Sequence, residues 1–375
     1  MMATQERPAS RRVAWLDSQI VRCNHRVQRA AWRAERAGLL ARQGHLEAAG
    51  REIADLHEEF DRQPLPEVSV GLYLAEAWMA YFSNLSPDAR AKVQRAHVLS
   101  EAAGLTQQRA LSSAWLAHFD YVRLEVEAMA NHVHEALALA APEAHATRSR
   151  ACLVLANAYH LAGRMDLAQP WYTRSRQHAV AEDDPMTLSA LIHNMAWHQA
   201  LQSVQAALWG EPGVATSLAR RAVTSAGSTH HFDLYRDVVS LPALIQVAIA
   251  MAQSVLGEPA EALALYEAHA PQADAQGLRP LRALVLADMA WCCHQVGHVA
   301  KATHYAEAAE TALVFSQHAD DKALAHGRLA LVFRVLKRSR LGKRHEAQSG
   351  VHQRAHQDLQ HRLLSALDGL VPHVR

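Results

Sequence analysis

The sequence predicts an all-α protein made of antiparallel helical hairpins that stack on one another. Half of its residues are apolar but only 6% are aromatic, and alanine supplies much of the apolar share, which is a helix-biased composition. At 375 residues the chain is too long for one ordinary compact core, unless it is a repeat protein that grows in one direction. Glycine-centred segments also recur along the chain, the last ones at gaps of 47, 47 and 40 residues. Together these observations favour a helical repeat array.

The first element is predicted to be one long amphipathic helix over residues 13–42, after a flexible N-terminus of residues 1–12. Five arginines follow one another at steps of four, three, four and three, which keeps them on one helical face opposite an apolar stripe. We call them the arginine stripe: Arg22, Arg26, Arg29, Arg33 and Arg36.

The arginine stripe has more than one interpretation. It is either the solvated outer face of the terminal repeat, or a cationic surface that docks an acidic protein, a neighbouring subunit or nucleic acid. In a third interpretation, Arg33 and Arg36 face inward and pair across the hairpin with glutamates such as Glu52 or Glu59.

The following elements are defined by a repeated turn. A helical stretch ends at glycine, alanine follows five residues later, and a bulky residue comes one turn after that. Glycine can end a helix in the left-handed backbone conformation without the steric cost that other residues have there. Alanine is small, so it lets the two helices of a hairpin approach closely. The turn glycines are Gly44, Gly163, Gly210, Gly257 and Gly297, and their alanines are Ala49, Ala168, Ala215, Ala262 and Ala302. Weaker turns are expected near Ser86, Glu127 and Gly342.

Two of these segments resemble the tetratricopeptide repeat (TPR). The matching residues are Leu155, Ala156, Tyr159, Gly163, Ala168 and Tyr172 in one unit, and Ala250, Gly257, Ala262 and Tyr266 in another. The resemblance covers roughly residues 20–370 and implies a right-handed α-solenoid of about seven to eight hairpins. The period exceeds the family's usual length of about 34 residues, and the closing proline is mostly missing. These departures favour the longer, irregular repeats of bacterial regulators.

The expected domain organisation is a repeat array over residues 13–320, followed by a degenerate last repeat and a C-terminal amphipathic helix over residues 321–375. Near residues 345–368, an apolar stripe is expected to pack on the last repeat or on a partner. It consists of Val351, Ala355, Leu359 and Leu363.

The TPR resemblance also implies a concave groove lined by residues of the first helix of each hairpin. Carried over residue by residue, these groove positions are Asn84, Asn157, His160, Trp291, His294 and Gln295. An asparagine side chain can donate to and accept from an extended peptide backbone, and an aromatic ring offers stacking area. The groove is therefore expected to bind a protein or peptide.

The sequence gives no positive reason to propose an enzyme or a cofactor. It lacks a nucleophile elbow, a phosphate-binding loop, a dinucleotide fingerprint and paired catalytic carboxylates. Its 25 histidines include no HExxH motif, so we expect no metal site. The formal charge of +1 gives no global case for binding nucleic acid or a membrane. The cysteines form no CxxC pair and no apolar leader is present, so a cytoplasmic protein is expected.

The predicted function is therefore a non-catalytic scaffold or regulatory adaptor that binds a protein or peptide, acidic if the arginine stripe takes part. Homodimerisation stays open. The alternative is a ligand-sensing signalling or transcription-regulator module without its output domain. Such a sensor would have a closed pocket with convergent aromatic side chains, for example Trp197, Trp209 and Trp291.

Overall fold

A computed structural model describes residues 11–238 and 241–368 of the chain. Throughout these residues the secondary structure is helical and no strand occurs. In this part of the chain, no helix is both long enough and apolar enough to cross a membrane. The expected flexible segment 1–12 lies mostly outside the described residues, and the first helix begins at Arg11.

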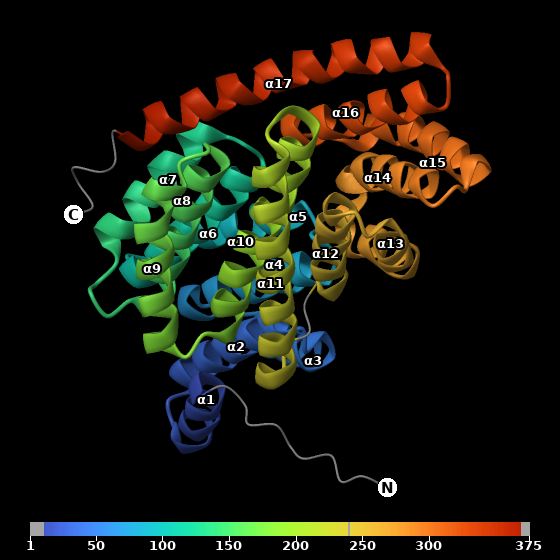
Figure 1. The fold of residues 1–375 in the computed structure, drawn as a ribbon. Helices are drawn as coiled ribbons and strands as arrows, with labels where there is room; N and C mark the ends of the chain where they lie inside the picture. Colours follow the sequence, from blue (N-terminus) through green and yellow to red (C-terminus); the bar gives the residue numbers. More distant parts are fainter. Residues whose placement is uncertain (1–10, 239–240, 369–375) are drawn as a thin grey trace, which may run out of the picture. The chain divides into compact units, whose positions relative to one another are not determined.

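Figure 1 labels the α-helices in chain order. They are α1 (Arg11–Arg22), α2 (Arg26–Gln43), α3 (Leu46–Phe60), α4 (Pro66–Asn84), α5 (Asp88–Ala102), α6 (Thr106–Val122), α7 (Val126–Leu139), α8 (His145–Leu161), α9 (Met165–Glu182), α10 (Pro185–Trp209), α11 (Pro212–Arg236), α12 (Pro242–Leu256), α13 (Pro259–Ala273), α14 (Arg282–Gln295), α15 (Val299–Ala312), α16 (Ala319–Val335) and α17 (Ser339–Asp368). Short helical turns η1 (Asp274–Leu278), η2 (Arg279–Leu281) and η3 (Leu313–Phe315) join some of them.

The chain divides into two compact units. Unit 1 comprises the described residues of Met1–Leu191, Phe232–Ser240 and Arg362–Arg375, and unit 2 comprises those of Ile192–His231 and Leu241–His361. Unit 1 thus holds α1 to α9 with the start of α10, and unit 2 holds α12 to α16 with most of α10, α11 and α17.

Within each unit, helices that follow one another pack as antiparallel pairs (Figure 1). In unit 1, α2 packs on α3 and α4, α6 on α7 and α8, and α8 on α9. In unit 2, α12 packs on α13, and α14 packs on α15 and α16. A helix that packs on two or more others buries an apolar face that one hairpin alone would expose. The predicted all-α class of helical hairpins is confirmed.

The repeated turn forms as the sequence predicts at four of its glycines. Gly44, Gly163, Gly257 and Gly297 each have a positive φ, between 74° and 89°. After Gly44, the backbone N–H of His45 donates to the carbonyl of Leu40 at 2.9 Å, which closes α2 with a Schellman bond. The alanines that follow these glycines are fully buried: Ala49, Ala168, Ala262 and Ala302. Small residues therefore lie where the paired helices meet.

Three expected turns differ in detail. Gly210 lies between α10 and α11 without a positive φ. The turn expected near Glu127 is centred on Leu124 (φ 57°), and the turn expected at Gly342 is centred on Lys337 (φ 59°), so that Gly342 lies inside α17. At the last two of these turns a residue other than glycine adopts the left-handed backbone, which removes the sequence signal that would have placed them.

The single helix predicted over residues 13–42 is wrong, because the chain breaks between α1 and α2 at residues 23–25. His25 precedes α2 with an extended backbone, and its Nδ1 accepts the N–H of Gln28 at 3.3 Å. A side chain that satisfies a free N–H in the first turn is the role of a helix N-cap. Arg22 therefore lies on α1, and the other four arginines of the stripe lie on α2.

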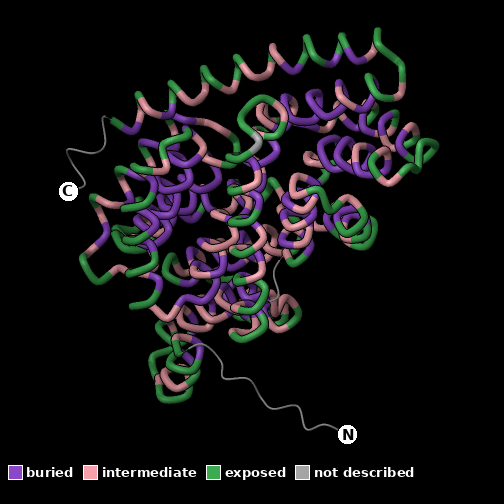
Figure 2. The backbone as a smooth tube through the Cα atoms, in the orientation of Figure 1, coloured by how far each residue is buried: buried purple, intermediate pink, exposed green. Residues whose placement is uncertain are grey.

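Burial differs strongly between helices (Figure 2). In α8 every residue from Ser149 to His160 is buried, so this helix lies in the interior of unit 1. In α17 the predicted apolar stripe packs only in part. Leu363 is buried, whereas Val351 and Ala355 are exposed.

Candidate ligand-binding site of unit 1

A group of polar and aromatic side chains lies inside unit 1, where five elements meet. Arg42 comes from the last turn of α2, Trp78 from α4, Trp115 from α6 and Arg150 from α8. Asp184 lies just before α10. Each of these five residues, which we call the Arg42 cluster, is at most 7% exposed.

Arg42 and Asp184 form the ion pair of the cluster. The Nη2 of Arg42 donates to Oδ2 of Asp184 at 2.7 Å and to Oγ1 of Thr187 at 3.1 Å. The other carboxylate oxygen of Asp184 accepts the backbone N–H of Thr187 at 3.0 Å, which caps the start of α10. Burial raises the pKa of Asp184, but the charge and hydrogen bonds of Arg42 and Thr187 outweigh it, so the net pKa is lowered and the carboxylate stays ionised.

No carboxylate of a described residue forms an ion pair with Arg150. Its guanidinium lies 4.1 Å from the ring centre of Trp115, and its Nη2 is 3.5 Å from Oγ1 of Thr187. Burial and the neighbouring charge of Arg42 lower the pKa of Arg150 to about 10. It therefore carries a charge at neutral pH inside the protein, compensated mainly by an aspartate that already pairs with Arg42.

Three N–H groups of the cluster have no hydrogen-bond partner among the described residues. They are Nε of Arg42, Nε of Arg150 and Nε1 of Trp78. A buried donor left without an acceptor costs about 1–3 kcal/mol, so native proteins seldom leave several in one place. Three donors together indicate a place for an acceptor.

The charges of the cluster do not cancel. Arg42 and Arg150 contribute two positive charges, and Asp184 contributes one negative charge. Burial and Arg150 lower the pKa of the neighbouring His118 to about 3, so its imidazole is neutral and adds no charge. In unit 2, by contrast, the buried Arg328 pairs one to one with Asp288, with Nε and Oδ1 2.7 Å apart.

A cavity of about 90 Å³ adjoins Arg42 and Trp78. Its rim carries three further acids, Glu35, Glu182 and Asp183. Glu35 and Glu182 share Arg12, at 2.6 Å and 3.9 Å, and Asp183 pairs with Arg236 at 2.6 Å. The cavity has room for a group the size of a carboxylate beside two of the unpartnered donors.

The arginine stripe is largely paired within its own hairpin. Arg33 pairs with Glu52 at 2.5 Å and with Glu59 at 3.0 Å, and Arg36 pairs with Asp17 at 2.7 Å and also with Glu52. Arg26 pairs with Glu59 at 3.1 Å. Arg22 and Arg29 are exposed and form no ion pair with a described residue. Docking of an acidic partner on this face stays a prediction that rests on those two arginines.

The predicted groove residues of unit 1 do not form one surface. Asn157 and His160 are both 2% exposed and contact the hydroxyl of Tyr172, which donates to Asn157 at 3.0 Å and lies 3.1 Å from Nδ1 of His160. These two side chains therefore link α8 to α9 inside the hairpin. Asn84 is exposed at the last residue of α4.

The predicted groove residues of unit 2 lie on α14. Trp291 is half-buried against an apolar cluster that includes Phe333, and its ring centre lies 6.0 Å from that of His294. Gln295 is exposed at the end of the helix. Their role in binding a partner stays a prediction.

Sequence reasoning missed the Arg42 cluster, although one signal was present. Arg150 directly precedes the apolar run of residues 151–156 in α8, and a charge in a helix that is buried on all sides requires a partner or a function. Arg42 gave no such signal, because it follows a segment that is already rich in arginine.

Comparison with known proteins relates the fold, and no more, to a solved structure. No family model matches the sequence. No curated protein matches it either. A crystal structure of a Rap protein complexed with competence and sporulation factor matches the fold with a TM-score of 0.55, covering 92% of this chain and 99% of that chain at 10% identity. The fold is a TPR-like helical repeat. At this identity, function has to be argued from the site.

Proposed function

We propose that this TPR-like protein is a non-catalytic regulatory scaffold that binds a protein or peptide, and that an acidic group of this partner docks at the Arg42 cluster. The observation that carries the proposal is the set of three unpartnered donors on Arg42, Trp78 and Arg150 beside an uncancelled positive charge. A carboxylate supplies both the missing acceptors and the missing charge.

The size of the cavity favours a macromolecular partner over a small molecule. Pockets for drug-sized ligands measure about 300–1,000 Å³, whereas this cavity measures about 90 Å³. It admits one side chain or one chain terminus, while the rest of the partner stays outside. The matched Rap protein, which was crystallised with competence and sporulation factor, supports a binding role for the fold.

A ligand-sensing regulator is the second candidate, because unit 2 has a larger cavity of about 360 Å³. Its lining is mostly apolar and includes Tyr266, Tyr305 and Met289. Neither cavity is lined by Trp197, Trp209 or Trp291, the tryptophans expected in such a sensor.

Affinity capture from a native lysate tests the first proposal. Arg150→Met removes one charge and one unpartnered donor but keeps the length of the side chain. We expect it to lose the main partner that the wild-type protein retains. The matched control is Arg174→Met, because Arg174 also lies over a tryptophan ring, 4.7 Å from that of Trp171, but is exposed on α9.

A charge reversal on the stripe, Arg22→Glu with Arg29→Glu, separates the two cationic surfaces. Loss of the partner by this variant alone would move the docking site to the N-terminal helices. Identical partner sets for wild type and Arg150→Met would contradict a role for the Arg42 cluster.

A further inference from the structure

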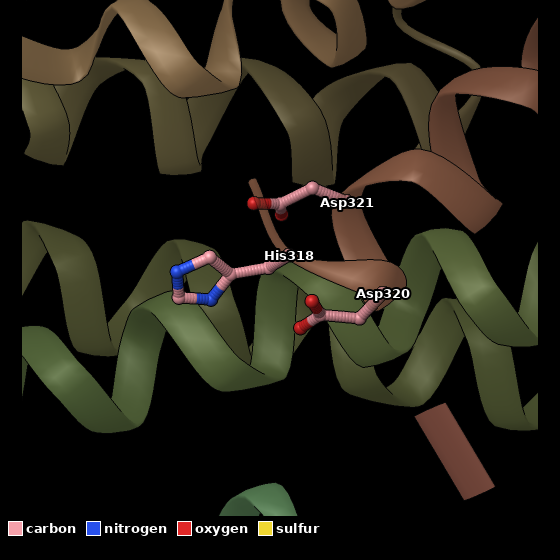
Figure 3. Close-up of side chains that lie close together, drawn as sticks. All are labelled: His318, Asp320 and Asp321. Carbon is pink, nitrogen blue, oxygen red and sulfur yellow. The ribbon is translucent and has the colours of Figure 1, made fainter. Parts of the chain in front are cut away.

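Three side chains that can bind a metal meet at the start of α16 in unit 2. His318 precedes the helix, and Asp320 and Asp321 lie in its first turn. One ligand atom from each residue lies within 4.8 Å of the others. Figure 3 shows the three side chains projecting to the same side of the chain. Ligands about 2.0–2.3 Å from one ion lie at most about 4.5 Å apart, so the group is already near the spacing that coordination requires.

Asp321 is the unusual member of this group. It is 7% exposed, and no hydrogen bond or ion pair joins its carboxylate to any residue that the structure describes. Asp320 is also an acid, and one carboxylate oxygen of each of the two side chains lies within 4.8 Å of the other. A buried carboxylate without a donor or cation is unfavourable, so the site lacks a positive partner.

The other two side chains are also available as ligands. The side chains of His318 and Asp320 form no hydrogen bond or ion pair with the described residues. The imidazole of His318 has two ring nitrogens, either of which can coordinate a metal ion.

Acidic residues in the first turn of a helix also have a purely structural role, because they interact with its positive end. That role accounts for an exposed aspartate, and it is worth only about 0.3–1 kcal/mol. This structural role does not account for Asp321, because Asp321 is buried and its carboxylate accepts no N–H from the helix.

We propose that His318, Asp320 and Asp321 form a binding site for a divalent transition-metal ion, with water completing its coordination. One imidazole and two carboxylates suit Zn²⁺ or Mn²⁺, and the nitrogen ligand disfavours Mg²⁺. The bound ion neutralises both aspartates and ties the start of α16 to the segment that precedes it. The site lies outside the Arg42 cluster and does not depend on the proposed function.

The test is a titration of the untagged protein with Zn²⁺, in competition with a weak chelator so that scattered histidines do not register. The wild type is expected to show one tight site, and Mg²⁺ is expected not to compete for it. Because each ligand is lost outright, Asp321→Asn, Asp320→Asn and His318→Ala are each expected to weaken binding about tenfold or more. Asp321→Asn keeps the size and shape of the buried side chain and should fold normally. If the Asp321→Asn protein does not fold, Asp320→Asn, at a partly exposed position, carries the test.

Two matched variants are controls. His298→Ala removes an exposed histidine at the same position before α15, and Asp88→Asn removes an exposed aspartate from the first turn of α5. Both should keep the wild-type affinity for Zn²⁺. Zinc-edge anomalous scattering from a crystal would place the ion among His318, Asp320 and Asp321. A peak elsewhere, no tight site in the wild type, or unchanged binding by Asp321→Asn would overturn the proposal.

Discussion

Arg150 is kept in its charged form at a free-energy cost that its surroundings do not fully offset. A pKa lowered from 12.5 to about 10 corresponds to a cost of about 3 kcal/mol. The contact of its guanidinium with the ring of Trp115 offsets part of this cost, on the order of 2 kcal/mol for a desolvated pair. A residue that weakens folding in this way is typical of a binding site, where a ligand supplies the missing interaction.

This balance predicts opposite effects for the two buried arginines. Arg150→Met should leave the free energy of unfolding unchanged or raise it by up to about 2 kcal/mol, because no ion pair is broken. Arg42→Met should lower it by about 3 kcal/mol, because Asp184 is then buried without its partner. Urea denaturation of the two variants and the wild type measures both effects.

If Arg150→Met destabilises the protein as much as Arg42→Met does, Arg150 is a structural residue. The cluster would then be satisfied by its own fold, and the case for a ligand there would fail.

At the scale of elements, the Arg42 cluster depends on how closely α2 approaches α4. Gly38 on α2 faces the indole of Trp78, and a Cβ at this position would lie 2.5 Å from two of its ring carbons. Gly71 on α4 faces α2 in the same way, where a Cβ would lie 2.8 Å from that of Ala34. Glycines on both helices therefore set the position of Trp78.

We expect Gly38→Ala to destabilise unit 1 by about 1–3 kcal/mol, because the added methyl group displaces Trp78 from a packed interior. The control is Gly50→Ala on α3, where the nearest atom to a Cβ is the sulfur of Met79 at 3.8 Å. This substitution should stabilise by about 0.5–1 kcal/mol, as alanine does in a helix. Thermal unfolding of both variants measures the difference. A Gly38→Ala protein as stable as the wild type would show that α2 and α4 can separate at no cost.

The sequence predicted the boundaries between helices correctly where the turn requires a particular residue type. Gly44, Gly163, Gly257 and Gly297 mark real turns, because each needs a backbone that glycine adopts readily. Lys337 and Leu124 adopt the same backbone without such a signal, and the break before α2 rests on one histidine cap. Propensity and periodicity do not show these features.

At the scale of the whole molecule, the candidate sites could not be predicted, because each is assembled by tertiary packing. Arg42 and Asp184 are 142 residues apart in sequence, yet their side chains lie 2.7 Å apart. Spacing within one segment says nothing about such a contact. His318, Asp320 and Asp321 are close in sequence, but the unusual property of Asp321 is its burial, which the sequence does not reveal. The arginine stripe is the opposite case. Its pattern is conspicuous in the sequence, but in the structure most of its arginines form ion pairs with nearby acids such as Glu52.

The most direct test of the proposed function is the affinity of one acidic peptide, selected from a random library on the wild-type protein, for wild type and Arg150→Met. The Kd is measured for the peptide and for a copy whose acidic group is replaced by the amide, which completes a double-mutant cycle. We predict that Arg150→Met weakens the acidic peptide at least about tenfold, or about 1.4 kcal/mol, and has no effect on the amide copy. Equal affinities of both proteins for the acidic peptide would contradict the account.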